Sequence, residues 1–176
     1  MRKIVYIFSA IIIFGVGLFI YWDWTERNSS FATPEEALGS VKNPSLEVVE
    51  IIDTKVLKGT NYAYVFFYSQ IDEPKDYYAV SEFEKGKYGW KFVRMFGGGN
   101  IVEDNANGGL AVGDVESGEY YGLATSNVST VNLVHLEAKL IPLDEKDMKI
   151  WIFFNPTSED MKSKPDFLDK DGKLLN

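Results

Sequence analysis

The residues that could do chemistry in this chain are few and widely spaced. His135 is the only histidine and the chain has no cysteine, so the usual zinc sites, which need several such ligands, are excluded. In the segment from Thr130 to Leu143, His135 shares a face with Glu137 and Lys139, so we expect its imidazole to face solvent. A Ser-His-Asp site stays formally open, but no serine lies in a nucleophile-elbow pattern. The sequence therefore predicts no catalytic residue, no metal site and no cofactor.

Acidic residues near the C-terminus raise the question of calcium. Asp166, Asp169 and Asp171 precede Gly172, and oxygen ligands beside a glycine at a sharp turn suit Ca²⁺. The spacing lacks the alternating acids and the twelfth-position glutamate of an EF-hand loop. We therefore expect residues 169–173 to form a tight hairpin turn.

A segment rich in glycine and asparagine, residues 97–109, holds two further candidates. Gly97-Gly98-Gly99 could let backbone amides approach a phosphate, but no G-x-G-x-x-G pattern and no long helix follows, so a flexible loop is favoured. Glu103 and Asp104 could serve as the carboxylates of a glycosidase that acts on the cell wall. Acids in a loop are usually solvated, so a cell-envelope hydrolase is an alternative function and not the first expectation.

Tyrosines are the candidate binding residues. Aromatic side chains on a sheet face can stack on sugars or grip a protein partner, although core and cross-strand packing is their commoner role. Seven tyrosines are predicted to include the contacts to an envelope protein or a glycan: Tyr62, Tyr64, Tyr68, Tyr77, Tyr78, Tyr120 and Tyr121.

One short helix and a series of strands must position these residues. Thr33 can cap the helix, Pro34 suits its first position, and Glu36 stands where a capping box requires it. Gly39 and the residues after it end the helix within two or three turns. Segments rich in β-branched and aromatic residues follow, with short turns between them, and indicate an antiparallel meander. These strands are expected at residues 46–57, 62–69, 77–84 and 90–96.

The chain after the glycine-rich loop is also rich in strands. They are expected at residues 120–125, 130–143, 148–154 and 173–175, with a hairpin turn at 144–147. The predicted fold class is mainly β (α+β), with an N-terminal transmembrane helix, a short helix packed on an antiparallel meander, and a second β-sandwich-like half. The expected organisation is a cytoplasmic start and anchor at 1–27, a tether at 28–32, helix and meander at 33–96, a loop at 97–109, and an all-β half at 110–176.

The first 27 residues predict the location. Arg2 and Lys3 precede an uncharged apolar run from Ile4 to Trp22, which as a helix measures about 28 Å, close to the hydrocarbon thickness of a bilayer. Because basic residues stay on the cytoplasmic side, we expect a single-pass cell-membrane protein with a cytoplasmic N-terminus and an extracytoplasmic domain from about Asn28. A cleaved signal peptide is the alternative, because Ser30-Phe31-Ala32 offers small residues at a cleavage site.

The net charge of the chain limits the kinds of molecule that it can bind. Eighteen Lys and Arg residues stand against 26 Asp and Glu residues, a net charge of −8. Nucleic-acid binding rests on neutralising phosphates, so an acidic domain argues against it. The expected partners are the membrane, through the N-terminal helix, and an envelope protein or glycan.

A further set of short motifs follows the basic start and the apolar run. They are Thr33–Leu38, Tyr64–Ser69, Gly89–Phe92, Tyr121–Ala124, Val128–Val131 and Leu168–Lys173. In this layout the chain resembles small uncharacterised exported proteins of low-GC Gram-positive bacteria that a single helix anchors in the membrane. The resemblance implies a bacterial cell-surface location and a compact β-sandwich end, and it carries over no catalytic residue.

Together these features predict a non-enzymatic binding, sensing or accessory module on the outer face of the membrane, where a tether raises the local concentration of a partner. The alternatives are the carboxylate hydrolase and an immunity protein or subunit of a membrane complex.

Overall fold

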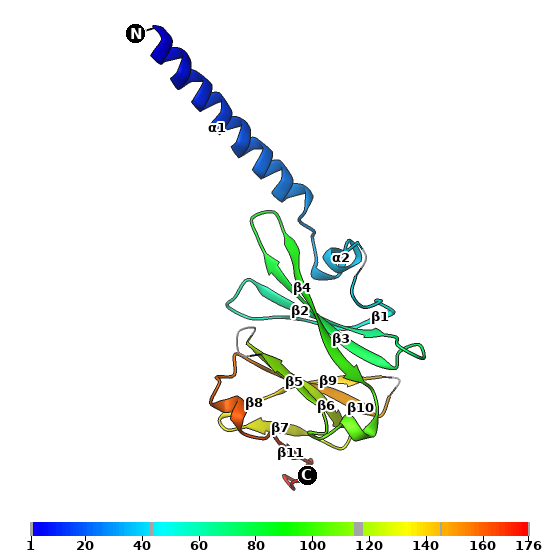
Figure 1. The fold of residues 1–176 in the computed structure, drawn as a ribbon. Helices are drawn as coiled ribbons and strands as arrows, with labels where there is room; N and C mark the ends of the chain where they lie inside the picture. Colours follow the sequence, from blue (N-terminus) through cyan, green and yellow to red (C-terminus); the bar gives the residue numbers. More distant parts are fainter. Residues whose placement is uncertain (1, 43, 115–117, 145, 176) are drawn as a thin grey trace. The chain divides into compact units, whose positions relative to one another are not determined.

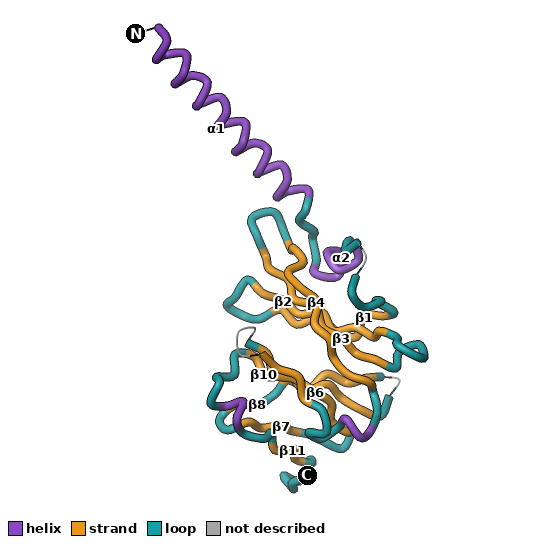
Figure 2. The backbone as a smooth tube through the Cα atoms, in the orientation of Figure 1, coloured by secondary structure: helices purple, strands orange, loops and turns teal. Residues whose placement is uncertain are grey.

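The computed structural model describes residues 2–42, 44–114, 118–144 and 146–175, and within the N-terminal helix it describes side chains from Ile13 on. The described chain is mainly β, with two α-helices and three sheets (Figures 1 and 2). The β part of the predicted fold class is therefore confirmed.

The predicted transmembrane helix is wrong as part of this fold. Among the residues that the structure describes, no helix is long and apolar enough to cross a membrane. In α1 (Arg2–Asn28) the uncharged stretch with described side chains runs from Ile13 to Trp22, because Asp23 follows. The earlier part of the predicted run, residues 4–12, lies outside the described side chains.

The second helix, α2 (Pro34–Gly39), follows the predicted capping pattern. The Thr33 side chain accepts a hydrogen bond of 3.2 Å from the Glu36 amide, and the Glu36 carboxylate accepts one of 3.0 Å from the amide of Ala32. Ser40 follows as the C-cap. The predicted helix start and its early end are both confirmed.

The first sheet has the predicted meander, with strands in the order β1-β2-β3-β4. Its strands are β1 (Glu50–Val56), β2 (Tyr62–Ser69), β3 (Tyr77–Lys85) and β4 (Trp90–Asn100). The last strand includes the glycine run, which was expected to be a loop. At Gly98 the backbone of β4 lies very close to β3: a Cβ there would stand 1.9 Å from the Tyr78 carbonyl oxygen. Only glycine, which has no Cβ, allows the two strands to pair this closely. The Gly98 amide also donates to the Tyr77 hydroxyl at 3.1 Å.

The rest of the chain forms two small antiparallel sheets and two 3₁₀ turns. One sheet has the order β5-β6-β10-β9 and the other β11-β7-β8. The strands are β5 (Ala111–Asp114), β6 (Glu119–Thr125), β7 (Thr130–Leu133), β8 (Leu136–Glu137), β9 (Lys139–Leu143), β10 (Met148–Phe154) and β11 (Asp166–Leu168). The turns are η1 (Glu103–Asn105) and η2 (Asp160–Lys162). The predicted hairpin at 144–147 is confirmed, because Leu143 of β9 pairs with Met148 of β10.

The two small sheets share one apolar core. It centres on Trp151, whose indole nitrogen donates to the Leu123 carbonyl oxygen at 2.9 Å and whose ring meets Phe153 and Phe167 edge-on. The other buried members come from several strands and loops: Ala124, Val128, Val131, Leu133 and Ala138. A packed core between two sheets agrees with the sandwich-like second half.

The segment predicted as one strand from Thr130 to Leu143 is interrupted. Leu133 of β7 pairs with Leu136 of β8, so Val134 and His135 form a two-residue turn, with Val134 at φ 55°. The alternating pattern around His135 predicted a continuous strand because it carries no glycine or proline to mark the turn.

The chain divides into two compact units, each made of segments that are separate in the sequence. One unit comprises residues 1–43, 54–65 and 81–94, and the other comprises 44–53, 66–80 and 95–176. Both units take segments from the first four strands. The division therefore interleaves along the sequence and does not fall at the glycine-rich segment.

Candidate binding site at the end of α1

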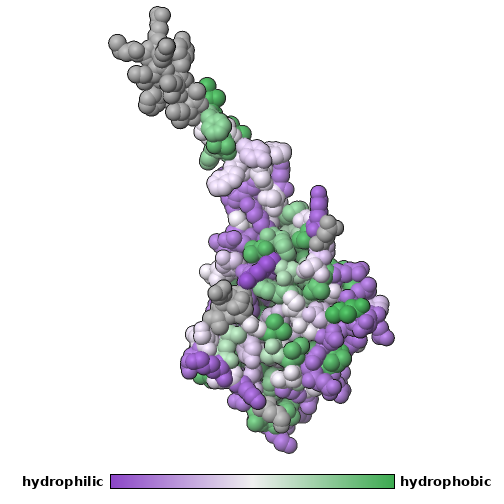
Figure 3. Space-filling model, viewed as in Figure 1, coloured by the Kyte–Doolittle hydropathy of each residue, from purple (hydrophilic) through white to green (hydrophobic). Residues whose placement is uncertain are grey.

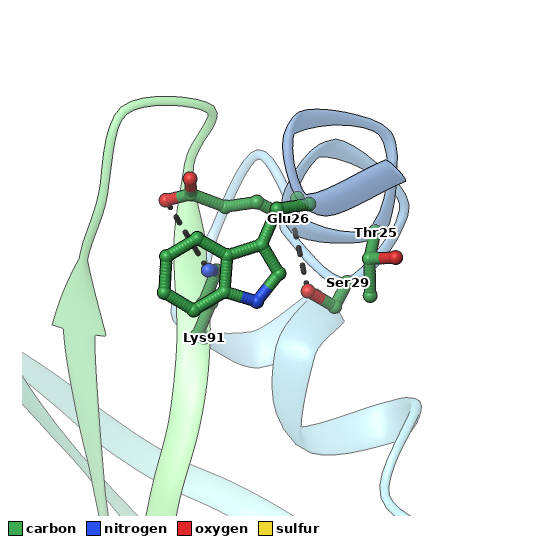
Figure 4. A pocket seen from close by; sticks show the side chains of 5 residues that line it. Thr25, Glu26, Ser29 and Lys91 are labelled. Carbon is green, nitrogen blue, oxygen red and sulfur yellow. Dashed lines mark hydrogen bonds and ion pairs between the residues drawn. The ribbon is translucent and has the colours of Figure 1, made fainter. Parts of the chain in front are cut away.

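A pocket of about 370 Å³ lies where the end of α1 meets β4, within the first unit. Trp22, Thr25 and Glu26 line it from the helix, Ser29 lines it from the residue just after the helix, and Lys91 lines it from the strand. Figure 4 shows the Glu26 and Lys91 side chains directed toward one another, and their charged atoms are 3.3 Å apart. Each side chain is about one third exposed, at 38% and 34%. The pocket therefore presents an ion pair that a ligand can still reach.

A second ion pair fixes the helix to the turn between β3 and β4. Lys87 Nζ lies 2.8 Å from Asp23 Oδ1, and the Tyr88 hydroxyl donates to the same oxygen at 2.5 Å. The hydrogen bonds from Lys87 and Tyr88 hold the pKa of Asp23 below its ordinary value, and the bond from Lys87 is the larger cause. The hydrogen bond to Asp23 in turn raises the pKa of Lys87. Both groups are therefore charged at neutral pH.

The backbone makes a third connection just beyond the helix. Phe31 and Trp90 exchange two hydrogen bonds, of 2.9 Å from the Phe31 amide and 2.8 Å from the Trp90 amide. Gly89, at φ +142°, precedes Trp90, and a Cβ there would stand 2.2 Å from the Phe31 carbonyl oxygen. Phe31, within the segment predicted as a tether at 28–32, is thus paired with the start of β4.

The hydroxyl groups of the pocket are already committed as donors. Thr25 Oγ1 donates to the Tyr21 carbonyl oxygen at 2.8 Å. Ser29 Oγ donates to the Glu26 carbonyl oxygen at 3.2 Å, as Figure 4 shows. A hydroxyl whose hydrogen is used this way still offers lone pairs. Toward a ligand, Thr25, Ser29 and Glu26 therefore act as acceptors, and Lys91 acts as the donor.

Apolar surface continues from the pocket along the helix. Leu18, Phe19, Tyr21 and Trp22 line a hollow of about 410 Å³, and Trp22 belongs to both hollows. A third, of about 210 Å³, adds Lys87 to Phe19, Trp22, Asp23 and Glu26. In Figure 3 the first described side chains of α1 are coloured as hydrophobic, and they give way to polar side chains toward the end of the helix. The site is thus apolar at one end and charged at the other.

The seven predicted tyrosines do not form one surface. Four are buried, one is exposed and two are intermediate. The buried ones are Tyr64, Tyr68, Tyr78 and Tyr121; the exposed one is Tyr62; the intermediate ones are Tyr77 and Tyr120. The four buried side chains serve the core, which leaves Tyr62, Tyr77 and Tyr120 for the predicted partner contacts.

Two of the buried tyrosines hold the glycine run of β4. The Tyr121 hydroxyl donates to the Gly97 carbonyl oxygen, and the Tyr121 ring meets Tyr78 edge-on at 6.4 Å. Burial raises the pKa of both phenols. Both therefore stay neutral hydrogen-bonding groups, and the glycine run serves packing of the sheet.

The other candidate residues lie apart from the pocket. His135 is exposed, as expected, with Nδ1 3.6 Å from the carboxylate of Asp160. Glu103 and Asp104 are exposed on η1, and Asp166 is exposed on β11. Asp169 accepts hydrogen bonds from the amides of Asp171 and Lys173, which confirms the tight turn. Within the described chain, no group of three or more His, Asp or Glu residues could hold a metal ion.

The sequence reasoning missed the pocket, although its signal is present. Trp22, Thr25, Glu26 and Ser29 follow the i, i+3, i+4, i+7 spacing of one helix face. The same residues also fit the end of a membrane anchor and its charged flank, which is what the sequence predicts for them. Lys91 could not be added from sequence, because its strand lies more than sixty residues further along the chain.

Comparisons with known protein families, with curated proteins and with solved structures found no match. The resemblance to exported proteins of Gram-positive bacteria therefore stays a prediction.

Proposed function

We propose that this chain is a non-enzymatic binding or accessory module that binds its partner at the pocket between α1 and β4. The observation that carries this proposal is the accessible Glu26–Lys91 ion pair beside Trp22, which is 79% exposed. Charged and aromatic groups close together on rigid elements are what a recognition site needs. The Phe31–Trp90 backbone pairing supplies most of that rigidity, and the Asp23–Lys87 ion pair adds to it.

The hydrolase alternative has no comparable support. Glu103 and Asp104 are exposed on a 3₁₀ turn and line none of the three hollows described above. A glycosidase needs two carboxylates that flank the scissile bond of a bound sugar, and adjacent exposed acids outside these hollows do not provide that arrangement. No specific observation favours an immunity protein or a complex subunit. The extracytoplasmic location and the contact with a membrane stay predictions of the sequence.

Photocrosslinking in the producing cells tests the proposed binding site. A photoreactive phenylalanine replaces Ser29 in the pocket, and in a control chain it replaces Lys170, which is exposed on the turn after β11. We expect a discrete adduct from the Ser29 position that is missing from the Lys170 position. Identical adduct patterns from both positions would contradict the site. Release of products from cell-wall glycan by the purified chain, lost in Glu103→Gln, would replace the binding function with the hydrolase.

A further inference from the structure

The site at the end of α1 changes from apolar to charged over about two helical turns. Leu18, Phe19 and Tyr21 line the apolar hollow, and Glu26 and Lys91 line the charged pocket, with Trp22 common to both. A ligand that fills both must itself be apolar at one end and charged at the other. Small polar metabolites and sugars lack the apolar part, and a hydrocarbon lacks the charged part.

The charged pocket offers an unequal set of acceptors and donors. The Thr25 and Ser29 hydroxyls donate their hydrogen bonds to backbone carbonyl oxygens, and Glu26 is a carboxylate. All three side chains can therefore accept hydrogen bonds from a ligand. A primary ammonium has three N–H donors and matches them, whereas a quaternary ammonium has none. Lys91, with Lys87 in the adjoining hollow, provides positive charge for an anionic group next to that ammonium. The chemistry that fits is a zwitterion in which a phosphate and a primary ammonium lie close together.

We propose that this site binds a phospholipid with a phosphoethanolamine headgroup at a bilayer surface. The ammonium lies against Glu26, the phosphate lies toward Lys91, and an acyl chain lies along Phe19 and Leu18. The inference rests on the proposed function, because it names the ligand class for that same pocket.

The surroundings of the pocket favour a lipid of a bilayer over a soluble amphiphile. Apolar side chains of α1 are exposed on all sides of the helix, by 52% to 79% of their surfaces: Ile13, Phe14, Val16, Leu18, Phe19, Ile20, Tyr21, Trp22 and Trp24. Exposed apolar surface of this kind marks an interaction site. Tyrosine and tryptophan prefer the level of lipid headgroups, where one end of the ring is apolar and the other is wet. Here Trp22 lines the charged pocket, Tyr21 lines the apolar hollow, and Trp24 is exposed on the same helix.

Lipid titration of the full chain tests the proposal. The delipidated protein in a non-ionic detergent is titrated with phosphatidylethanolamine, phosphatidylcholine and phosphatidylglycerol of identical acyl chains, and bound lipid is counted by native mass spectrometry. We expect phosphatidylethanolamine to bind about fivefold or more tightly than the other two lipids. Glu26→Gln and Lys91→Met should each weaken that binding about tenfold or more, as loss of a charged hydrogen bond does.

Two control variants make the same changes in charge at residues outside the pocket. Glu84→Gln and Lys170→Met alter exposed residues outside the site and should leave the affinity within about twofold of the unaltered chain. Near-ultraviolet circular dichroism checks that all four variants keep the fold. Equal binding of the three lipids, or unchanged affinity in both pocket variants, would overturn the proposal.

Competition with a soluble headgroup distinguishes binding of an intact bilayer lipid from binding of a free phosphoethanolamine group. Glycerophosphoethanolamine that competes as strongly as the intact lipid would overturn the assignment to a bilayer lipid, because the apolar hollow would then contribute nothing. Crosslinks from Ser29 to a protein, without any preference for phosphatidylethanolamine, would reject the lipid and leave the proposed binding function standing.

Discussion

Gly98 is the residue at which a side chain is least tolerable on β4. A Cβ at this position would stand 1.9 Å from the Tyr78 carbonyl oxygen, so the strands would have to separate. The same glycine donates its amide to the Tyr77 hydroxyl. The glycine run thus allows close strand pairing beside the buried tyrosines.

Gly98→Ala is expected to destabilise the protein by about 2 kcal/mol or more, because backbone and not a flexible side chain obstructs the new methyl group. Urea unfolding followed by tryptophan fluorescence measures the change in the free energy of unfolding. Gly39→Ala is the control, since nothing lies within 4 Å of its Cβ position, and its effect should stay within about 0.5 kcal/mol. Equal effects of the two substitutions would contradict the close approach of β3 and β4.

Asp160 links pH to stability. The Thr157 hydroxyl donates to its carboxylate at 2.7 Å and the Thr157 amide donates at 2.8 Å, which lowers the pKa of Asp160. A carboxyl whose pKa is lower in the folded state stabilises the fold above the unfolded-state pKa of about 3.9. That contribution is lost as the pH falls through the lowered pKa.

Asp160→Asn should therefore unfold at lower urea than the unaltered chain at pH 7, and the difference should shrink toward pH 2. Urea midpoints at pH 7, 4 and 2.5 test this expectation. Part of the acid sensitivity should persist in the variant, because the pKa values of Asp23 and Asp76 are lowered as well. A midpoint difference that is constant from pH 7 to pH 2.5 would show that the ionised Asp160 does not stabilise the fold.

At the scale of elements, the connection between α1 and the β3–β4 hairpin decides whether the pocket exists. The connection has the Asp23–Lys87 ion pair, the Glu26–Lys91 ion pair and the Phe31–Trp90 backbone pairing. Surface ion pairs alone stabilise weakly, usually by less than about 1 kcal/mol each. The backbone pairing is therefore the part that we expect to hold the helix end against β4.

Gly89→Ala is predicted to open this connection, because its Cβ would stand 2.2 Å from the Phe31 carbonyl oxygen. Hydrogen exchange at the Phe31 amide should speed up about tenfold or more as the local opening free energy falls. Gly172→Ala is the matched control: Gly172 also has a positive φ, of 77°, but nothing lies within 4 Å of its Cβ position. If both variants accelerate exchange at Phe31 equally, the close contact at Gly89 does not hold the helix end.

At the scale of the whole molecule, the first half of the chain is divided between the two compact units, with some of its segments in each. The unit that contains all of residues 95–176 also contains residues 44–53 and 66–80. Tyr78, from one of these earlier segments, packs against Tyr121. A cut at the glycine run therefore removes part of the second unit.

A fragment of residues 97–176 is expected to unfold at lower urea than the intact chain and with a shallower transition, because it exposes Tyr121 and leaves the glycine run without β3. Urea unfolding of the fragment and of the intact chain, followed by far-ultraviolet circular dichroism, measures this. A fragment with the same midpoint and an equally steep transition would show that the predicted boundary, and not the interleaved one, separates the folding units.

Sequence alone determined the features that depend on local chemistry. Thr33, Pro34 and Glu36 specified the start of α2, and the alternation of aromatic and β-branched residues specified the four-stranded meander. The tight turn at Asp169 followed from its short acidic and glycine-containing sequence. The net charge of −8 needed no structure, and it argues against nucleic acid as a partner.

Only the tertiary structure decided the features that depend on distant residues. Gly98 pairs within the sheet because the Tyr78 backbone lies against it. Four of the seven tyrosines are buried because neighbouring strands cover them. Lys91 joins Glu26 only after β4 meets the end of α1. Local patterns report spacing along one element, whereas a pocket is made of side chains from elements that the sequence does not place together. For this reason the sequence predicted most of the strands and missed the candidate binding site.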